Sequence, residues 1–203
     1  MRSLYLLLIV LGLALFATML VGCAPATHAS SVVKINVGEG HGSGVHLGNG
    51  LIITAAHVVN GMEPLRVTDD GGAIHKAERM WANTVFDLAM VKMETPDDVA
   101  VSEMICTIPE VGDPVEAVGY PLNLGKVHSW GTVSSGARSI DGAWRMANST
   151  DMSLIFGQSG GPVFNPQKRV VGFVVGGASV RGSWTAFTFI VPSKVACDLL
   201  GWV

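Results

Sequence analysis

The segment FGQSGGPVF, residues 156–164, sets a single serine among three glycines. Glycines let the backbone turn sharply and bring several amide N–H groups close to one point. A serine hydroxyl becomes an effective nucleophile at neutral pH when a neighbouring base takes its proton, and an attacked carbonyl needs N–H donors for its developing charge. Ser159 is therefore a candidate nucleophile, with the backbone N–H groups of Gly157 and Ser159 as candidate oxyanion donors. A purely structural glycine turn is the alternative interpretation.

The order of histidine, aspartate and serine along the chain limits where that base can lie. Residues 157–161 fit G-x-S-x-G, but the nucleophile elbow with this pattern needs its histidine after the serine. The last histidine is His128, so that arrangement is excluded. An order of aspartate, histidine and serine would leave His75 or His128, because the first aspartate is Asp69. The remaining order is histidine, aspartate and serine, as in chymotrypsin.

The segment GLIITAAHVV, residues 50–59, offers the best-placed base. Its apolar run predicts a strand, and the small residues after the run leave room for the ring of His57 to turn into a cleft. No such setting surrounds the other histidines that we considered, which we interpret as surface or space-filling residues: His41, His46, His75 and His128.

The segment FDLAMVKM, residues 86–93, places Asp87 at the start of an otherwise apolar run. A carboxylate that such neighbours draw toward the core is costly to bury without a partner. An imidazole whose second nitrogen is held by a buried carboxylate keeps one tautomer and one orientation. We therefore expect Asp87 to accept a hydrogen bond from His57.

The elements that must position these residues are short β-prone runs broken by Gly, Asn, Asp and Pro, which begin near residue 32. Their length and spacing predict an all-β fold. An acidic, proline-containing stretch at 93–114 divides the runs, so we expect two subdomains at about 32–94 and 114–191. Residues 192–203 have the pattern of a short C-terminal helix.

The N-terminus has the pattern of an export signal. Met1 and Arg2 give a basic start, and a long apolar run then leads to small residues before Cys23. The final LVGC resembles the lipobox of bacterial lipoproteins, in which the cysteine is acylated and becomes the new N-terminus. We expect a lipoprotein signal at 1–22, a lipid on Cys23 that anchors the chain to a membrane facing the periplasm or cell exterior, and a tether at 23–31. An uncleaved membrane anchor and soluble secretion are the alternatives.

The composition argues against several kinds of partner. A net charge of -3 without a basic patch argues against nucleic acid. The sequence has neither a CxxC nor an HExxH motif, so it gives no support to a zinc site, and a serine–histidine mechanism requires no metal or other cofactor. Cys106 and Cys197 could form a disulfide in an oxidising compartment. The alternative, which we favour, is a pair of buried thiols.

The segments GSGVHLGNGLIITAAHVV, DLAMVKM and GQSGGPVFN together resemble the trypsin-like serine peptidase superfamily, and most closely the bacterial Deg-like proteases. The similarity covers nearly all of residues 32–191. It implies a protease domain at 32–203, built of two six-stranded antiparallel β-barrels with the active site between them. It also implies an endopeptidase that acts on proteins or peptides through an acyl-enzyme. His57 would be its general base, Asp87 the orienter of that base and Ser159 the nucleophile.

Two departures from this family change the expectations. Deg-like enzymes usually carry PDZ domains after the protease domain, whereas this chain stops at Val203, so we expect no activation through such a domain. Digestive relatives have an aspartate before the nucleophile that pairs with a freed N-terminus, and this chain has Gln158 there. A neutral side chain cannot form that ion pair, so we expect a loop that is preformed or is ordered by substrate.

A protease-like binding module and an esterase with the same residues are alternative functions.

The same resemblance implies the residues of the substrate pocket. Its floor would lie at Ser153 and would carry no charge. Val175, Gly176 and Gly177 would offer backbone groups to an extended peptide, and Thr188 would narrow the pocket. We therefore expect an uncharged, small-to-medium apolar residue before the scissile bond.

Overall fold

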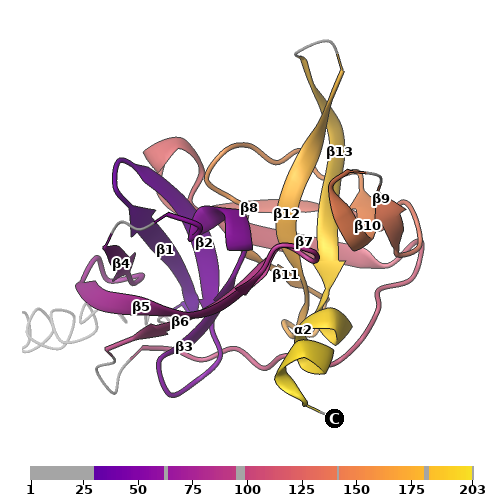
Figure 1. Ribbon diagram of the computed structural model, residues 1–203. Helices are drawn as coiled ribbons and strands as arrows, with labels where there is room; N and C mark the ends of the chain where they lie inside the picture. Colours follow the sequence, from indigo (N-terminus) through magenta and orange to yellow (C-terminus); the bar gives the residue numbers. More distant parts are fainter. Residues whose placement is uncertain (1–29, 62–63, 95–98, 141, 181–182, 203) are drawn as a thin grey trace, which may run out of the picture.

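The computed structural model describes residues 30–61, 64–94, 99–140, 142–180 and 183–202 (Figure 1). The predicted signal at 1–22, Cys23 and nearly all of the predicted tether at 23–31 lie outside the described residues. Within the described ranges, no helix is long and apolar enough to cross a membrane.

The first half of the described chain forms a closed barrel of antiparallel strands in the order β1-β2-β3-β6-β5-β4 (Figure 1). These strands are β1 (Val32–Val37), β2 (Gly40–His46), β3 (Leu51–Thr54), β4 (Leu65–Thr68), β5 (Ile74–Asn83) and β6 (Leu88–Met93). In β4, Leu65 and Val67 are buried while Arg66 between them is exposed, which is the two-residue period of a strand with one buried face. The barrel is therefore filled from within by alternate, mostly branched side chains.

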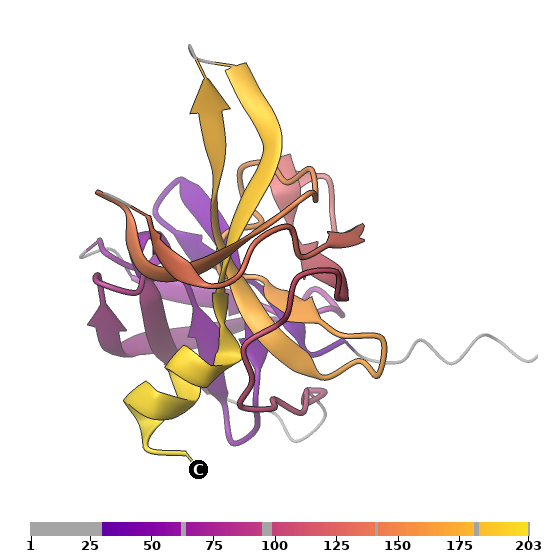
Figure 2. The same cartoon turned by 90° about the vertical axis from the view of Figure 1, so that its right-hand side faces the viewer.

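The second half forms a seven-stranded sheet in the order β8-β7-β11-β12-β13-β10-β9. These strands are β7 (Pro114–Gly119), β8 (Val127–Thr132), β9 (Arg138–Ile140), β10 (Trp144–Thr150), β11 (Pro162–Phe164), β12 (Val170–Val180) and β13 (Ser183–Pro192). An antiparallel bridge between Val133 and Thr150 joins the continuation of β8 to β10, so the sheet curls back on itself. The β12–β13 ribbon extends beyond the rest of the sheet (Figure 2). The predicted all-β, chymotrypsin-like class is confirmed, and the seventh strand arises because β9 pairs with the outer edge of β10.

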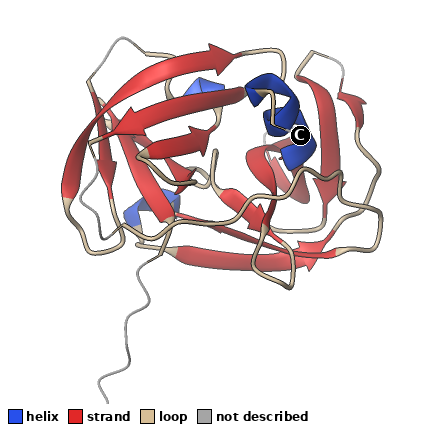
Figure 3. Cartoon of the chain, turned by 90° about the horizontal axis from the view of Figure 1, so that it is seen from below, coloured by secondary structure: helices blue, strands red, loops and turns tan. Residues whose placement is uncertain are grey.

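An apolar cluster joins the barrel to the second sheet. It includes Ile53 and Leu88 from the barrel and Phe164, Phe173 and Val191 from the sheet, all buried. Strands, rather than helices, are the main regular structure of the described chain (Figure 3). Because protein interiors are close-packed, the cluster fixes the position of the two units relative to each other. Side chains from both units can therefore keep a fixed geometry where the units meet.

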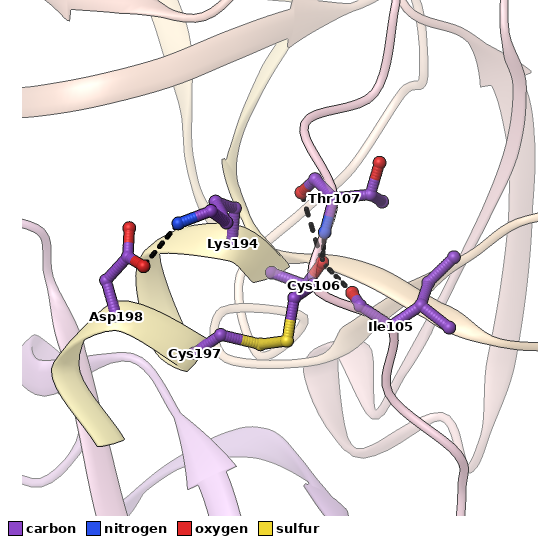
Figure 4. The surroundings of a disulfide bond; sticks show 7 residues. Ile105, Cys106, Thr107, Lys194, Cys197 and Asp198 are labelled. Atoms are coloured by element: carbon purple, nitrogen blue, oxygen red, sulfur yellow. Dashed lines mark hydrogen bonds and ion pairs between the residues drawn. A yellow bond between two sulfur atoms is a disulfide. The ribbon is translucent and has the colours of Figure 1, made fainter. Parts of the chain in front are cut away.

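The predicted C-terminal helix is α2 (Ser193–Leu200). Its first turn is tied to the segment that crosses between the two units, because Lys194 N–H donates to the Thr107 carbonyl at 3.1 Å. This contact brings Cys106 beside Cys197, and the structure joins them in a disulfide with a Cα–Cα distance of 5.8 Å (Figure 4). The preference for two buried thiols was wrong, since docking of α2 on the crossing segment aligns the two cysteines.

Candidate active site

His57 follows β3 in a short 3-10 turn, η1 (Ala56–Val58). Its ring Nδ1 lies 2.7 Å from Asp87 Oδ2, and its backbone N–H donates to Asp87 Oδ1 at 2.9 Å. The two oxygens of one carboxylate thus bind the ring and the backbone of the same residue. This double contact fixes the ring orientation and leaves Nε2 on the side of the ring that faces away from Asp87.

Asp87 has a left-handed backbone, with φ at 55°, a conformation that aspartate adopts more readily than most residues. Its carbonyl accepts the Ala56 N–H at 3.1 Å, so its backbone and its side chain both bind the segment that carries His57. The residue is 8% exposed, because the next residue, Leu88, is fully buried in the shared core. A third donor reaches Asp87 from the second sheet: Trp144 Nε1–H lies 3.3 Å from Oδ2.

Ser159 lies on the loop between β10 and β11, and both structural units hold that loop. The Ser159 carbonyl accepts the Ser43 N–H from β2 at 2.8 Å, and the next N–H, of Gly160, donates to the Val174 carbonyl of β12 at 2.7 Å. Gly160 has φ at 79°, and a Cβ there would lie 2.1 Å from Thr54 Oγ1. Glycine at this position is therefore required both by its backbone angle and by the close approach of the barrel.

Gly157 is oriented by contacts on either side of it. Its φ is 98°, and a Cβ would lie 2.4 Å from the Tyr120 carbonyl oxygen. The preceding carbonyl, of Phe156, accepts the Leu122 N–H at 3.1 Å from the short turn η2 (Pro121–Asn123). Because a trans peptide group is planar, with C=O and N–H pointing in opposite directions, the Gly157 N–H points away from Leu122.

Gln158 closes this loop from within. It is 2% exposed, its Oε1 accepts the Ile155 N–H at 2.9 Å, and its Nε2 donates to Ser129 Oγ at 3.3 Å. The Gln158 N–H also donates to the Ile155 carbonyl at 3.2 Å. The neutral side chain therefore braces the turn before Ser159 by hydrogen bonds within the second sheet.

A cleft of about 650 Å³ brings the predicted residues together. Its lining comprises His57, Asn60, Thr84, Asp87, Leu122, Ala143, Trp144, Leu154, Ile155, Phe156, Ser159, Val174, Val175, Gly176 and Gly177. The candidate base, orienter and nucleophile thus share one cavity with the three predicted backbone positions at 175–177. The lining is otherwise mostly apolar.

Two predicted pocket residues do not line this cleft. Thr188 is 1% exposed and donates to the Met152 carbonyl at 2.7 Å, so its side chain is turned into the sheet. Ser153 is exposed and lies outside the cleft lining. The apolar walls at 154–156 and Trp144 were missed by sequence reasoning. The apolar pair Ile155 and Phe156 directly before Gly157 was the available signal for the first of these walls.

The other histidines with a described position make structural contacts. His46 is 2% exposed, accepts the Gly50 N–H at Nε2 and pairs its Nδ1 with the Ala100 carbonyl. His41 Nε2 lies 2.8 Å from the Tyr120 carbonyl oxygen. His75 pairs with Asp69 at 2.8 Å and His128 with Glu116 at 2.7 Å. In the described part of the chain, the cleft lining includes none of these four.

Two ionisable groups near the meeting of the two units have shifted pKa values. Burial alone would raise the pKa of Asp69, but the hydrogen bond with His75 and those from nearby backbone N–H groups lower it overall. Burial, and then the nearby carboxylates of Asp70 and Asp69, raise the pKa of Tyr120 to about 12. Tyr120 therefore keeps its proton to higher pH than an ordinary tyrosine, and its hydroxyl donates to the Val32 carbonyl at 3.3 Å.

Comparisons with known proteins show the family and the fold of this chain. The family model of the trypsin-like peptidase domain matches residues 42–173, a range that contains His57, Asp87 and Ser159. The crystal structure of the serine endoprotease from Yersinia pestis superposes with a TM-score of 0.73 at 26% identity, covering 86% of this chain and 63% of that chain.

Curated relatives are similar in sequence. A probable periplasmic serine protease do/HhoA-like of Haemophilus influenzae is 29% identical over 172 residues, 80% of this chain and 36% of the relative. A probable periplasmic serine endoprotease DegP-like of Rickettsia prowazekii is 31% identical over 158 residues, 75% of this chain and 31% of the relative. The chain thus spans about a third of the length of these relatives. Together with the matched domain, these similarities establish that the chain belongs to the trypsin-like peptidase family.

Proposed function

We propose that this chain is a serine endopeptidase that cleaves protein substrates through an acyl-enzyme. The observation that carries the proposal is that one cleft is lined by Ser159 and by the hydrogen-bonded pair of His57 and Asp87. None of these groups is an effective hydrolytic catalyst alone. Together they supply a nucleophile, a base and an orienter of that base.

In the proposed mechanism, His57 Nε2 takes the proton from Ser159 Oγ as the oxygen attacks the substrate carbonyl carbon. Asp87 accepts the Nδ1–H and stabilises the imidazolium that forms. The protonated His57 then gives its proton to the leaving amine, which leaves an ester on Ser159. Water attacks this ester by the same route in reverse, with His57 again as the base, and releases the new carboxyl terminus.

The negative charge on the attacked oxygen would be stabilised by the N–H groups of Gly157 and Ser159. The bond between Leu122 N–H and the Phe156 carbonyl supports a preformed loop, because it fixes the orientation of the peptide group that carries the Gly157 N–H. The buried hydrogen bonds of Gln158 support a preformed loop, since they require neither a freed N-terminus nor an ion pair. No cofactor enters the reaction.

The apolar lining of the cleft favours substrates with uncharged, apolar side chains near the scissile bond. An extended peptide would pair with the backbone at Val175, Gly176 and Gly177. The predicted roles of Ser153 and Thr188 gain no support, because neither side chain faces the cleft. The walls at 154–156 take their place in the proposal.

A fluorophosphonate, which reacts with activated serines, tests the site. We expect labelling of the wild type at Ser159, none in Ser159→Ala, and a rate lower by about 10³-fold or more in His57→Ala. Ser153→Ala is the matched control and should label as the wild type does, because Ser153 lies outside the cleft lining. Cleavage of an unfolded protein by the unlabelled wild type, lost once Ser159 is labelled, separates an endopeptidase from an esterase or a binding module. A wild type that neither labels nor cleaves would overturn the proposal.

We also propose that the chain is exported and anchored to a membrane by a lipid on Cys23, as the N-terminal pattern indicates. Two relatives named above are described as periplasmic, which supports export. Mass spectrometry of the mature N-terminus tests the anchor. A diacylglyceryl group on Cys23 is the expected result, and an unmodified start at residue 24 or later would contradict it.

A further inference from the structure

Trp144 connects the second sheet to the carboxylate of Asp87. Its indole N–H donates to Oδ2, the same oxygen that lies 2.7 Å from His57 Nδ1. Trp144 begins β10, whereas Asp87 directly precedes β6 of the barrel. We propose that Trp144 is a positioning residue, which holds Asp87 through its indole N–H while its ring forms a wall of the substrate cleft. The inference rests on the proposed function and adds a residue to it.

Several contacts fix the indole ring where it can reach Asp87. The ring packs against Phe189, with ring centroids 5.2 Å apart. A Cβ on Gly176 would lie 2.9 Å from two ring carbons of Trp144, so the ring lies directly against the glycine backbone. The next residue, Arg145, donates its N–H to the Val85 carbonyl at 3.2 Å. The strand end that carries Trp144 is therefore anchored two residues away from Asp87.

The indole N–H completes the set of donors around a nearly buried carboxylate. Asp87 Oδ1 binds the His57 backbone N–H, while Oδ2 binds the ring and the indole. Without the indole, more negative charge would remain on the oxygen that faces the imidazole. Such a carboxylate holds a proton on the imidazole more strongly. The base would then become available only at higher pH, and the carboxylate would be freer to rotate.

The ring itself has a separate effect, because Trp144 lines the cleft beside Val175 and Gly176. A phenyl ring in its place keeps most of this wall but has no N–H. An alanine removes both. The two substitutions therefore separate the positioning of Asp87 from the binding of substrate.

A kinetic test compares Trp144→Phe with Trp130→Phe, a matched change at a tryptophan that is 69% exposed on β8. Active sites are counted with the fluorophosphonate, so that loss of folded protein does not count as loss of rate. We expect Trp144→Phe to lower kcat about tenfold, as for loss of a hydrogen bond to a charged group. KM should change little, and the acid limb of the pH–rate profile should move to higher pH. Trp144→Ala should also raise KM, and Trp130→Phe should change none of these.

The effect must pass through Asp87 if Trp144 acts as a positioning residue. In an Asp87→Asn background, Trp144→Phe should therefore lower kcat less than about twofold, because the two substitutions remove one shared interaction. An unchanged kcat and acid limb in Trp144→Phe would overturn the inference. An equal tenfold loss with and without Asp87 would overturn it as well.

An NMR measurement tests the contact without relying on turnover. The chain has five tryptophans, and the indole N–H signal that disappears in Trp144→Phe identifies Trp144. We expect Asp87→Asn to move this signal upfield, because a charged acceptor is lost, and to leave the Trp130 signal in place. A Trp144 signal that ignores Asp87→Asn would overturn the inference. If the wild type turned over no substrate while the signal responded, the proposed function would fail and the contact would stand.

Discussion

Two imidazole–carboxylate pairs in this protein have nearly the same geometry. The Nδ1–oxygen distance is 2.7 Å both in His57–Asp87 and in His128–Glu116, and the histidine side chains are 50% and 42% exposed. The surroundings differ, since His57 shares a cleft with Ser159 while His128 stacks on Trp130. Neither distance nor exposure therefore singles out His57 as the candidate base. Its place in the same cleft as Ser159 does so.

The two carboxylates also differ in the charge of their partners. Asp87 binds two uncharged donors besides the imidazole, the His57 backbone N–H and the Trp144 indole. Glu116 instead contacts the ammonium group of Lys168. Burial alone would raise the pKa of Glu116, but hydrogen bonds from Lys168 and then His128 outweigh it and lower the pKa. The Glu116 carboxylate is therefore shared between a lysine and a histidine, whereas Asp87 has the His57 imidazole and neutral donors as its partners.

The largest expected difference between the pairs is in activity. Asp87→Asn would place an amide beside His57, and an amide N–H there favours the tautomer whose Nε2 carries the proton and cannot accept one from Ser159. We expect kcat/KM on a fluorogenic peptide to fall about 10³- to 10⁴-fold. Glu116→Gln is the matched change at the other pair, and its kcat/KM should stay within about twofold of wild type. Similar losses in both variants would erase the distinction between the pairs.

Removal of the Cys106–Cys197 disulfide, which belongs to neither pair, should change stability without changing activity. The disulfide closes a loop with a sequence separation of 91, and loss of such a bond typically costs about 2–4 kcal/mol. We therefore expect Cys106→Ala with Cys197→Ala to lower the free energy of unfolding by that amount and to leave kcat unchanged at a temperature where the protein is folded. Urea denaturation measures the cost. A midpoint equal to that of the oxidised wild type would show that the crosslink contributes nothing.

Sequence predicted what depends on local pattern. Short alternating runs predicted the strands. Ser159 was predicted to be a nucleophile because the glycines around it allow a sharp turn of the backbone. Small residues before His57 and the apolar run after Asp87 pointed to a crevice and to burial, and the structure brings these residues to one cleft. Each of these signals lies within a few residues of the position it concerns.

The features that sequence missed depend on contacts between distant segments. Trp144 is separated by 57 residues from the carboxylate that it binds, and Cys106 meets Cys197 only because α2 docks on the crossing segment. Thr188 fails to line the cleft for a related reason. Successive side chains in a strand point to opposite faces, and the pairing of Thr188 with Thr150 and Gly177 sets which face it takes. A resemblance to a family does not fix that register.

The smallest expected effect is on the free energy of unfolding, and it concerns the His128–Glu116 pair. The folded protein holds the pKa of Glu116 below its ordinary value, so Glu116 adds stability above its unfolded pKa and loses it as pH falls through the folded pKa. Glu116→Gln should therefore lower the free energy of unfolding at pH 7 by about 1.5 kcal/mol, the low end for loss of a hydrogen bond to a charged group, because the Lys168 side chain is 69% exposed. The difference from wild type should close as the pH is lowered below the range in which carboxylates titrate. Glu39→Gln, at an exposed glutamate, is the control and should change stability little at any pH. Urea denaturation from pH 7 to pH 3 measures the difference, and a deficit that stays constant across this range would mean that the charge of Glu116 has no structural role.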